Sequence, residues 1–490
     1  MLCFVYFLPR PGDWNQDSRL DTDLAIVNHG SLQVDRYRWN APGDIVPYQG
    51  HWYPSKAPGQ ALLGIPVFAA YKGALTLAGH RADAEQLGLK TQFHRLYAQF
   101  YIAQFLESMY TVTIPAVAFL LLFFWFLGYF SDSFLNRTIL TLALGLSTGY
   151  FAYAQVFYPH VSTAAVLFGA FMLLYVAGRG ARGEPARAPR LEGNPALATF
   201  LAGLCLGAAG LLDHTAAAPG AVIAAYALFR VPPKLWLFVA LGALPGLLIT
   251  AGYNYAAYHN IGVTGYSTGD SGVGGSPIGG AIAGQPNYGS PLWGMSFSPF
   301  RGIFFLSPFL LLAFPGMALW RRRGIEWLVC LAASMVLFLV VSSIYFWYGG
   351  SAMGPRYLIQ MLPFLALPVI FVLDRAKSLP GRLGVYALIL ISTLNVWLQT
   401  IAAKGYPSPK FSDPLFQWAI PNVERGNVAL SLGSVLLAPF VGIYSKWTLL
   451  PLLIVILLWT WYCFRSEIKV AALRLSDRRT GSVSRAKEAR

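Results

Sequence analysis

The sequence predicts an all-α polytopic membrane protein, and three observations support this class. The chain has 490 residues, of which 56% are hydrophobic and only 12% charged. Its mean hydropathy is +0.51. Apolar runs long enough to cross roughly 30 Å of hydrocarbon as helices recur along it. The clearest are Ser108–Phe130, Ile139–Phe157, Val161–Val176, Leu235–Tyr255, Gly302–Trp320, Trp327–Trp347, Tyr357–Leu373 and Trp447–Phe464. A large soluble protein could bury one or two such runs, but not this many.

The positive charge of the chain is concentrated in short connections. The net charge is +15, from 36 Lys and Arg against 21 Asp and Glu. Half of these cations fall in four groups, at 179–190, 321–323, 375–382 and in the tail 465–490. This positive-inside distribution argues against a nucleic-acid partner and predicts that these segments, including the C-terminus, are cytoplasmic. The tail is expected to be a disordered basic end near anionic lipid.

Alternation from these four anchors assigns the remaining polar segments to the extracytoplasmic face. They are residues 10–107, the turns near 158–160 and 213–214, the loop 257–301, the turn 347–356 and the loop 403–427. The apolar segments Ala61–Ala78 and Val428–Ile443 would break this alternation if they crossed, so both are expected to lie at the outer surface. About eleven or twelve spans then remain. We therefore predict a multi-pass integral protein of the plasma (inner) membrane whose active face is extracytoplasmic.

The chain divides into four predicted regions. Residues 1–9 are too short to span and are expected to be the remnant of a first transmembrane helix. Residues 10–107 form a first extracytoplasmic loop with juxtamembrane helices, which we expect to be catalytic. Residues 108–464 form the transmembrane helical domain, including the Gly-rich loop 257–301, which fits a lid or a flexible link. Residues 465–490 are the basic cytoplasmic tail.

Four acidic residues follow the N-terminal stub closely. They are Asp13, Asp17, Asp21 and Asp23. Acids at the start of a helix complement its dipole, and DSRLDTDLAIV fits a helix with an acidic first turn. A carboxylate in a partly apolar pocket at the membrane surface can also act as general base on an acceptor hydroxyl or amine. We expect one of these acids to be catalytic and favour Asp17.

The same loop holds an aromatic and basic segment, GHWYPSKAPG. Lys56 lies at the edge of an apolar run, where an ammonium group would meet a phosphate or an anionic headgroup. Trp, Tyr and Lys also populate the interface of membrane proteins in general, so anchoring is the alternative. We expect Lys56 to bind phosphate, and Asp44, His51 and Tyr53 to line a substrate pocket.

Short outer turns bring further polar groups to the same face. Ionisable groups left in lipid cost at least about 2.5–3.5 kcal/mol, which makes such residues functional candidates, although snorkelling to water is the alternative for each. The planar fork of Arg suits phosphate oxygens. The expected phosphate-binding residues are Arg301, Arg356 and Tyr357. The expected pocket residues are His160, Asp213 and His214.

Several signatures of other chemistries do not occur in the sequence. It contains no Walker A motif and no HExxH. Asp21-Thr22-Asp23 is too short to predict a metal site, so we expect neither a metal nor a cofactor. The four cysteines lie in apolar runs without the spacing of a metal site or a disulfide framework. They are Cys3, Cys205, Cys330 and Cys463.

The polar motifs follow one another in a fixed order. The acidic patch is followed by His29-Gly30, by Lys56-Ala57-Pro58-Gly59 and by Arg95. Later come YNYAAYHNIGVTGY, SPFRGIFFLSPFLLLA and GGSAMGPRYLIQMLPFLALP. Over roughly residues 10–465 this ordered set resembles the GT-C glycosyltransferases, in particular their phospholipid-carrier-dependent members. The most similar branch is that of protein O-mannosyltransferases and lipid A aminoarabinose transferases, which carry a Lys-Pro-Pro-Leu-like element where this chain has Lys-Ala-Pro-Gly.

The resemblance implies a GT-C-type bundle of about 11–12 transmembrane helices. It implies inverting transfer of a hexosyl or pentosyl group from a polyprenyl-phosphate-linked donor to a protein, lipid or glycan acceptor, usually without a metal. An Asp would deprotonate the acceptor while Arg and Lys hold the departing phosphate. The family's Asp-Glu pair falls on Asn15-Gln16, and neither residue can act as a base. Asp17, and after it Asp21, are the expected substitutes.

Two other classes of function remain open. A flippase or transporter of lipid-linked sugars would place ionisable residues near the membrane midplane and often show two similar halves. Here the polar residues gather at one face and no halves are apparent. A catalytically inactive homologue that binds lipid carriers would account for Asn15-Gln16. The expected partners are the polyprenyl-phosphate-linked sugar, membrane lipids and an acceptor that the sequence does not identify.

Overall fold

The computed structural model describes residues 1–10, 12–80, 93–185, 187–268, 290–443, 445–462 and Arg465. The side chains of residues 93–98, 268 and 438 are not described. The centre of the predicted lid, the predicted tail beyond Arg465, the side chain of Arg95 and Cys463 therefore lie outside the described residues.

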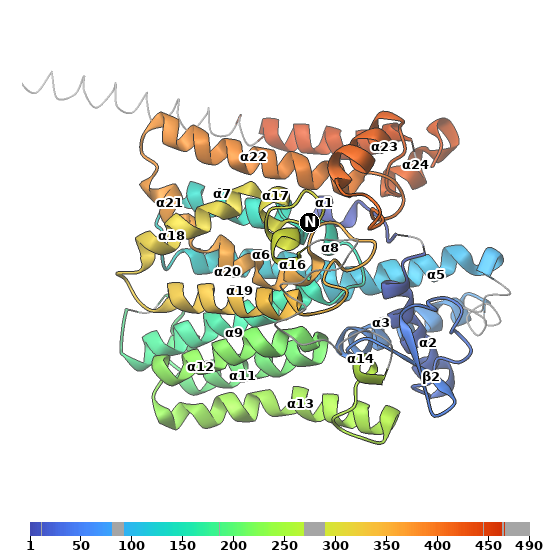
Figure 1. Cartoon of the computed structure of the whole chain (residues 1–490), viewed down its shortest axis with the longest axis horizontal. Coiled ribbons are helices and arrows are strands. Elements are labelled where there is room, and N and C mark those ends of the chain that lie inside the picture. Colours follow the sequence, from blue (N-terminus) through green and yellow to red (C-terminus); the bar gives the residue numbers. More distant parts are fainter. Residues whose placement is uncertain are drawn as a thin grey trace, which may run out of the picture.

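The first part of the chain folds into helices and one short hairpin (Figure 1). The elements are α1 (Leu2–Val5), α2 (Trp14–His29), β1 (Ile45–Tyr48), β2 (His51–Pro54), α3 (Gly59–Leu77), α5 (Phe93–Ser108), the π-helical turn η2 (Met109–Thr113), α6 (Ile114–Leu127), α7 (Phe134–Leu146), α8 (Tyr150–Tyr153), α9 (His160–Ala181), α10 (Pro189–Glu192), α11 (Pro195–Leu212), η3 (His214–Ala216), α12 (Ala217–Arg230), η4 (Pro233–Leu235) and α13 (Trp236–Tyr258).

The regular elements among the described residues of the second part are all helices. Its elements are α14 (Gly265–Thr268), α16 (Pro291–Ser296), α17 (Ile303–Leu306), η5 (Pro308–Leu312), α18 (Ala313–Trp320), α19 (Glu326–Ser342), η6 (Arg356–Met361), α20 (Leu362–Ala366), α21 (Val369–Arg375), α22 (Leu379–Ile401), η7 (Leu415–Ala419), α23 (Ile420–Glu424), α24 (Leu432–Val441) and η8 (Lys446–Leu449).

The predicted all-α polytopic class is confirmed. By length and composition, six helices in the described part of the chain can cross a membrane: Gly59–Leu77, Gln99–Leu127, His160–Ala181, Pro195–Leu212, Pro233–Tyr258 and Leu379–Ile401. A pair bent by 41°, Arg356–Ala366 with Val369–Arg375, makes a seventh if it is one span. Four shorter apolar helices accompany them: Phe134–Leu146, Pro308–Trp320, Glu326–Ser342 and Lys446–Tyr462. The count of about eleven or twelve spans stays a prediction.

Three runs that the sequence presents as continuous are interrupted in the structure. Ile139–Phe157 breaks between α7 and α8, Gly302–Trp320 is divided among α17, η5 and α18, and Tyr357–Leu373 is divided among η6, α20 and α21. Pro308 and Pro368 lie at two of these breaks. Proline lacks the backbone N–H of a helical bond, and its ring clashes with the preceding turn. Hydropathy does not register such breaks.

The loop 10–107 contains a β-hairpin beside its helices, which the sequence analysis did not predict. β1 and β2 pair antiparallel from Ile45 opposite Pro54 to Tyr48 opposite His51. Gln49 and Gly50 form the turn with φ of 48° and 85°. Positive φ at both turn residues is the geometry that matches the twist of a two-residue hairpin. The hairpin brings the residues on either side of it, 44 and 55–56, next to one another.

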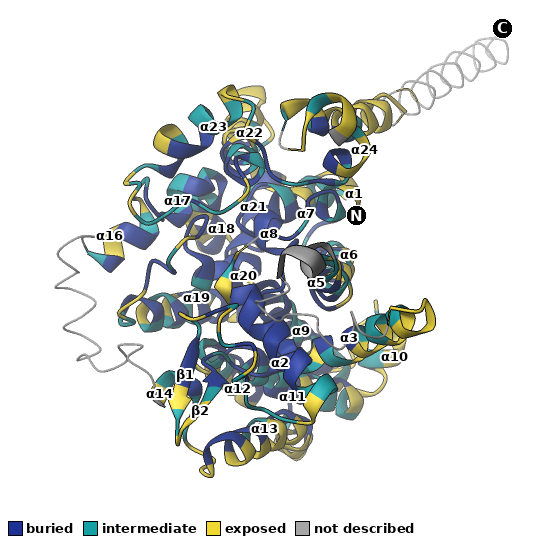
Figure 2. Ribbon diagram, turned by 90° about the vertical axis from the view of Figure 1, so that its right-hand side faces the viewer, coloured by how far each residue is buried: buried dark blue, intermediate teal, exposed yellow. Residues whose placement is uncertain are grey.

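The helix α2 lies at one end of the bundle and is buried although it is polar (Figures 1 and 2). Its apolar side, including Leu20 and Leu24, packs with Phe68 of α3 and Phe100 of α5. Its N-terminal cap is Asp13, whose side chain accepts a bond from the Asn15 backbone N–H. The packing thereby fixes the first turn of α2, and with it a row of carboxyl groups, against the ends of the apolar helices.

Small residues let α11 and α13 approach closely. A Cβ atom added at Gly203 would lie 2.0 Å from the Val239 carbonyl oxygen, and one at Gly242 would lie 2.0 Å from the Phe200 carbonyl oxygen. These glycines are followed four residues later by Gly207 and Gly246, which are similarly crowded. Such small-xxx-small faces let membrane helices pack backbone against backbone. The outer face of α13 instead exposes Leu237, Leu241, Leu244, Leu247 and Leu248, as expected for a lipid-facing surface.

We predict that Gly242→Ala destabilises the protein. The added methyl group meets backbone that cannot move aside, so overpacking should cost about 1–3 kcal/mol. Gly252→Ala is the matched control, because Gly252 lies on the same helix with no atom within 4 Å of the added Cβ. It should be neutral or slightly stabilising, since Ala is favoured over Gly in a helix by about 1 kcal/mol. Melting temperatures in detergent check this, and equal effects of the two variants would contradict the packing.

Candidate functional site

A cavity of about 500 Å³ lies beside the first turn of α2. Its walls come from four segments that are far apart in the sequence and that the charge pattern assigned to one face. They contribute Arg10, Gly12, Asp13, Trp14, Asn15, Asp44, Gly349, Gly350, Ser351, Arg356, Gly405 and Tyr406. Carboxylates and guanidinium groups therefore face one space at the end of a bundle of apolar helices, and this is the candidate active site.

One hydroxyl group, that of Tyr158, links the Asp13 carboxylate and the Arg356 guanidinium of this cavity. The Tyr158 hydroxyl lies 2.9 Å from Oδ1 and 2.8 Å from Oδ2 of Asp13 and donates to that carboxylate. Nη1 of Arg356 donates to the same hydroxyl oxygen at 3.1 Å. Tyr158 is fully buried and Arg356 is 8% exposed. The start of α2, the turn before α9 and the start of η6 are thus fixed relative to one another.

The environment tunes Asp13 toward a basic role. Burial raises its pKa above the ordinary value, while the Tyr158 hydroxyl and Arg356 partly offset this rise. A carboxylate with a raised pKa takes up a proton more readily near neutral pH than an ordinary aspartate does. Asp13 lines the cavity and is only partly buried, so a substrate can reach it.

Arg356 is fixed beside the cavity, and one of its N–H donors makes no hydrogen bond to the described residues. Its Nη2 donates to the Tyr357 hydroxyl at 3.3 Å. Within the described part of the chain its buried Nε has no hydrogen-bond partner. A Cβ at Gly349, which has φ of +73°, would lie 2.8 Å from that Nε. Glycine thus allows both the left-handed turn and the close approach of the guanidinium. An unpaired guanidinium donor beside a cavity suits an anionic oxygen.

The hairpin places a buried ion pair at the cavity edge. Nζ of Lys56 lies 2.7 Å from Oδ1 of Asp44, and the two side chains are 12% and 18% exposed. Burial alone would raise the pKa of Asp44, but Lys56, Arg356 and Arg19 outweigh it and lower that pKa. Burial would likewise lower the pKa of Lys56, and Asp44 reverses this and raises it. Both groups are therefore charged at neutral pH, and Lys56 is held by Asp44.

The two acids predicted to be catalytic lie deeper along α2, outside the lining of the cavity. Oδ1 of Asp17 accepts from Nε2 of Gln104 at 3.0 Å, and Oδ1 of Asp21 accepts from Nδ2 of Asn40 at 2.8 Å. Burial raises the pKa of both well above the ordinary value, with the Asp13 charge adding to the effect at Asp17. Their catalytic role stays a prediction, and the structure places both carboxyl groups away from the cavity lining.

Arg301, predicted to bind phosphate, is engaged with backbone carbonyl groups. It is 1% exposed. Its Nε donates to the Tyr348 carbonyl at 3.2 Å, and its Nη2 donates to the Gly350 carbonyl at 2.9 Å and to that of Pro407 at 3.4 Å. Gly350 lines the cavity. The geometry therefore gives Arg301 a role in shaping the cavity wall.

The predicted pocket residues His160 and Asp213 form a buried network behind Tyr158. Nδ1 of His160 lies 3.1 Å from Oδ2 of Asp213, which also accepts from Nε2 of Gln360 at 2.9 Å. The rings of His160 and Tyr158 are 5.7 Å apart. Burial would raise the pKa of Asp213, but its bond with His160 and two from Thr215 lower it to about 2. This network supports the wall that carries Tyr158.

The remaining predicted residues lie around the edge of the site. Tyr357 accepts from Arg356, and its ring is 5.5 Å from that of His160. The ring of His214 packs 5.8 Å from Tyr266. His51 is exposed on the hairpin and pairs with Asp35 at 2.7 Å. Tyr53 is buried and packs with tyrosines from the hairpin and α13. His51, Tyr53 and His214 do not line the cavity.

Sequence reasoning missed several residues that form the cavity. Asp13 belongs to the acidic patch, but the sequence gives no reason to prefer it over Asp17. Tyr158 precedes the predicted His160 by two residues, which is the one signal that could have found it. Arg10 lies over the Tyr406 ring at 4.2 Å and donates to the Gly405 carbonyl at 2.7 Å. No pattern in the sequence marks this long-range pairing.

Among the described residues, no three His, Cys, Asp or Glu side chains gather in a way that could hold a metal ion. Cys3, Cys205 and Cys330 are free thiols. The predicted absence of a metal or cofactor in the reaction stays untested.

Comparison with known proteins gives a distant structural likeness. No protein-family model matches the chain, and no curated protein sequence matches it. Apo ArnT from Cupriavidus metallidurans is 14% identical with a TM-score of 0.47, over 89% of this chain and 77% of that one. The same protein bound to undecaprenyl phosphate is 15% identical with a TM-score of 0.44, over 89% and 76%. Likeness at this level carries no argument about the function of this chain.

We predict that Lys56→Gln lowers the melting temperature. Removing one partner of a largely buried ion pair leaves the other charge unpaired, at a cost of about 3 kcal/mol. Because the folded-state pKa of Asp44 is lowered, the contribution of the pair is present above the ordinary Asp range and is lost as the pH falls through that folded-state pKa. The gap between wild type and variant should therefore narrow in acid.

Melting curves recorded across pH check this prediction. Lys410→Gln is the control, because Lys410 is exposed and no ion pair of its side chain occurs among the described residues. A gap between wild type and Lys56→Gln that is unchanged by pH, or an equal loss in Lys410→Gln, would contradict the proposed electrostatics.

Proposed function

We propose that this protein is a membrane glycosyltransferase that moves a sugar from a polyprenyl-phosphate-linked donor to an acceptor hydroxyl or amine. The observation that carries the proposal is that Asp13 and Arg356 line one cavity and share the Tyr158 hydroxyl. A base and a phosphate-binding cation are the two groups that such a transfer requires. The ordered sequence motifs that resemble GT-C glycosyltransferases support the choice of donor.

In the proposed reaction Asp13 accepts the proton of the acceptor O–H or N–H. The acceptor atom attacks the anomeric carbon of the sugar from the side opposite the phosphate. The bond between that carbon and the phosphate oxygen breaks, and its electron pair stays on the oxygen, which leaves as polyprenyl phosphate. The configuration of the sugar is inverted, and water takes the proton from Asp13 after release of the products.

The charges of the site fit this course. Negative charge develops on the departing phosphate, and a fixed guanidinium in a site that excludes bulk water stabilises it without reorganisation. Arg356 is buried and pre-oriented by Tyr158 and Tyr357. The Asp44–Lys56 pair adds a nearby ammonium group without adding net charge. Asp13 and Arg356 both contact the Tyr158 hydroxyl and both line the cavity, so the acceptor can meet the carboxylate while the phosphate meets the guanidinium.

The position of the cavity fits a lipid-linked substrate. It lies at the end of helices long enough to cross the membrane, so a polyprenyl chain can lie along apolar helices while its phosphate reaches Arg356. From the positive-inside pattern we propose that this end is extracytoplasmic and that the membrane is the inner membrane. We propose that the sugar is a hexose or a pentose and that its acceptor is a protein, a lipid or a glycan.

We predict that Asp13→Asn abolishes turnover while Asp17→Asn retains most of it. Loss of a general base costs about 10²–10⁴-fold in rate. Asp17 lies outside the cavity lining, and the Oδ1 of an Asn there can still accept from Gln104, so its replacement changes little. Purified full-length protein is incubated with radiolabelled polyprenyl-phosphate sugars, and free polyprenyl phosphate is measured.

The same assay separates the alternatives. If turnover is lost in Asp17→Asn but not in Asp13→Asn, the general base is Asp17. No turnover with any donor, combined with saturable binding that Arg356→Gln abolishes, would identify a carrier-binding protein without transferase activity. Movement of the donor across vesicle membranes without cleavage would identify a flippase.

We predict that Tyr158→Phe moves the acidic limb of the pH–rate profile to higher pH. The hydroxyl stabilises the charged form of Asp13, so without it the already raised pKa rises further. Activity, which requires ionised Asp13, is then lost at a higher pH as the solution is acidified. Tyr153→Phe is the control, because the Tyr153 hydroxyl bonds the Met353 backbone instead. An unshifted limb in Tyr158→Phe would show that Asp13 is not the titrating base.

A further inference from the structure

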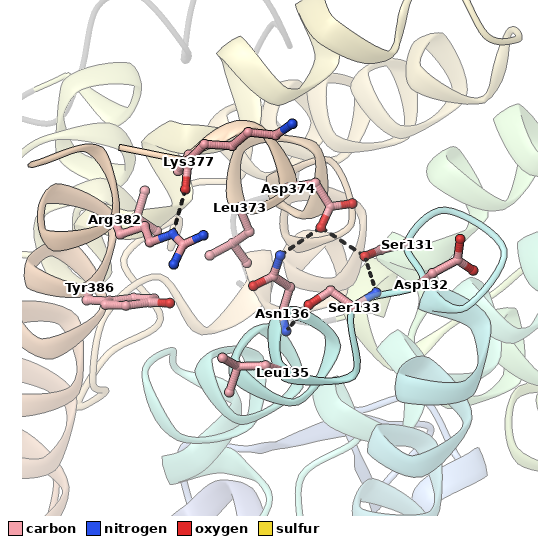
Figure 3. A pocket seen from close by; sticks show the side chains of 12 residues that line it. Ser131, Asp132, Ser133, Leu135, Asn136, Leu373, Asp374, Lys377, Arg382 and Tyr386 are labelled. Atoms are coloured by element: carbon pink, nitrogen blue, oxygen red, sulfur yellow. Dashed lines mark hydrogen bonds between the residues drawn. The ribbon is translucent and has the colours of Figure 1, made fainter. Parts of the chain in front are cut away.

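Two adjoining cavities lie away from the candidate active site, and we refer to them together as the basic cavities. The first has a volume of about 540 Å³ and lies between the start of α7, the end of α21 and the start of α22 (Figure 3). The second, of about 510 Å³, lies between the end of α18 and the end of α21. Asp374 and Lys377 line both, so the two form one continuous polar surface.

The basic cavities lie at the opposite membrane face from the active site. α22 has 23 residues, which corresponds to about 35 Å of helix. Arg382 near its start lines a basic cavity, whereas Gly405 and Tyr406 just beyond its end line the active-site cavity. The bent pair of helices also runs from one site to the other. Arg356 at its start lines the active-site cavity, and Arg375 at its end lines a basic cavity. These helices separate the two sites by about the thickness of the hydrocarbon.

The cations of the basic cavities are not neutralised by the protein. They are Arg321, Arg322, Arg323, Arg375, Lys377 and Arg382. No ion pair within the described ranges joins any of the six to a carboxylate. Asp132 pairs instead with Arg187 at 3.3 Å. Oδ1 of Asp374 accepts from the Ser131 hydroxyl at 2.9 Å and from Nδ2 of Asn136 at 2.7 Å.

Part of this surface is ordered before any ligand binds. Nε of Arg382 donates to the Ala376 carbonyl at 2.9 Å, which fixes the base of its guanidinium beside the cavity (Figure 3). The guanidinium of Arg323 lies 5.5 Å from the Phe371 ring. Side chains held in this way lose less entropy when they bind an anion.

Exposed apolar side chains border the cations. Leu135 and Leu319 line the cavities and are 61% and 44% exposed, and Leu379 and Leu383 at the start of α22 are 69% and 57% exposed. Like the exposed leucines of α13, these side chains are expected to face lipid, so the cations stand at the edge of an apolar surface. A molecule with an anionic head and an acyl tail would satisfy both the cations and the leucines.

We propose that the basic cavities bind the phosphate headgroup of an anionic membrane lipid in the leaflet opposite the active site. Basic pockets between the ends of membrane helices have the charge and shape for such headgroups. The bound lipid would hold together α18, α21 and α22. The chain beyond the far end of α22 supplies Gly405 and Tyr406 to the candidate active site, and the bent pair that ends in α21 begins at Arg356, which also lines it. Binding is measured without turnover, so this proposal stands or falls independently of the proposed function.

The test is binding of lipids to the purified full chain in a neutral detergent, followed by native mass spectrometry. The probes are phosphatidylglycerol, phosphatidylcholine and inorganic phosphate. The test variant is Lys377→Gln/Arg382→Gln, and the control with the same change of charge is Arg190→Gln/Lys234→Gln. All four side chains are exposed, and melting temperatures verify that both proteins fold.

We expect wild type and control to retain phosphatidylglycerol in preference to phosphatidylcholine. The test variant should bind it about 25-fold more weakly, since each cation contributes about fivefold. Equal weakening in the control would overturn the proposal and indicate general surface charge. Equal binding of phosphatidylcholine would show that the anionic charge is not recognised. Displacement of the lipid by inorganic phosphate at equal concentration would indicate a site for a free anion.

Discussion

The Tyr158 hydroxyl lies between Asp13 and Arg356, and the candidate site depends on that contact. It joins the N-terminal cap of α2, the turn before α9 and the start of η6. Burial strengthens the contact, because polar groups removed from water interact through a low local dielectric. The segments behind it are themselves fixed, by the Arg301 bonds to backbone carbonyls and by the Asp213 network. The cavity is therefore shaped before a substrate enters.

The carboxyl groups along α2 differ in pKa and in access to the cavity because they are buried to different depths. Asp17 and Asp21 are enclosed by the packing of α2 against α3 and α5, and burial favours their protonated forms. Asp13, at the first turn, faces the cavity. Asp44 keeps its charge because Lys56 lies 2.7 Å away. A gradient of burial along α2 thus leaves one reachable carboxylate with a moderately raised pKa, which is the state that a general base requires.

The two polar ends of the bundle differ in how their charges are balanced. At the active-site end, cations and carboxylates are interleaved and linked by hydrogen bonds. At the opposite end, six cations stand near two carboxylates that are engaged elsewhere. The first arrangement holds a precise geometry, whereas the second holds an excess of positive charge at the edge of the lipid. The same helices, α22 and the bent pair, carry both ends.

The sequence by itself determined the class of the protein and the location of its polar chemistry. Long apolar runs fix an all-α membrane protein because an unsatisfied backbone in lipid is too costly. Charge alternation assigned to one face the three polar segments in which every lining residue of the cavity lies, namely 10–107, 347–356 and 403–427. The sequence also marked Asp44, Lys56 and Arg356 as candidate site residues, because ionisable groups are rare and costly in such a chain.

Only the tertiary structure decided which of these residues face one another. Hydropathy does not register helix breaks, two of which lie at proline, so three spans appeared continuous. The acidic patch offers four aspartates of identical chemistry, and the packing of α2 alone distinguishes Asp13 from Asp17. Arg301 and Arg356 look alike in sequence. Arg301 bonds backbone carbonyls, whereas Arg356 keeps a donor without a partner among the described residues. Partners 106 and 198 residues away in the sequence decide what each guanidinium touches. Long-range packing, rather than residue type, assigns the roles.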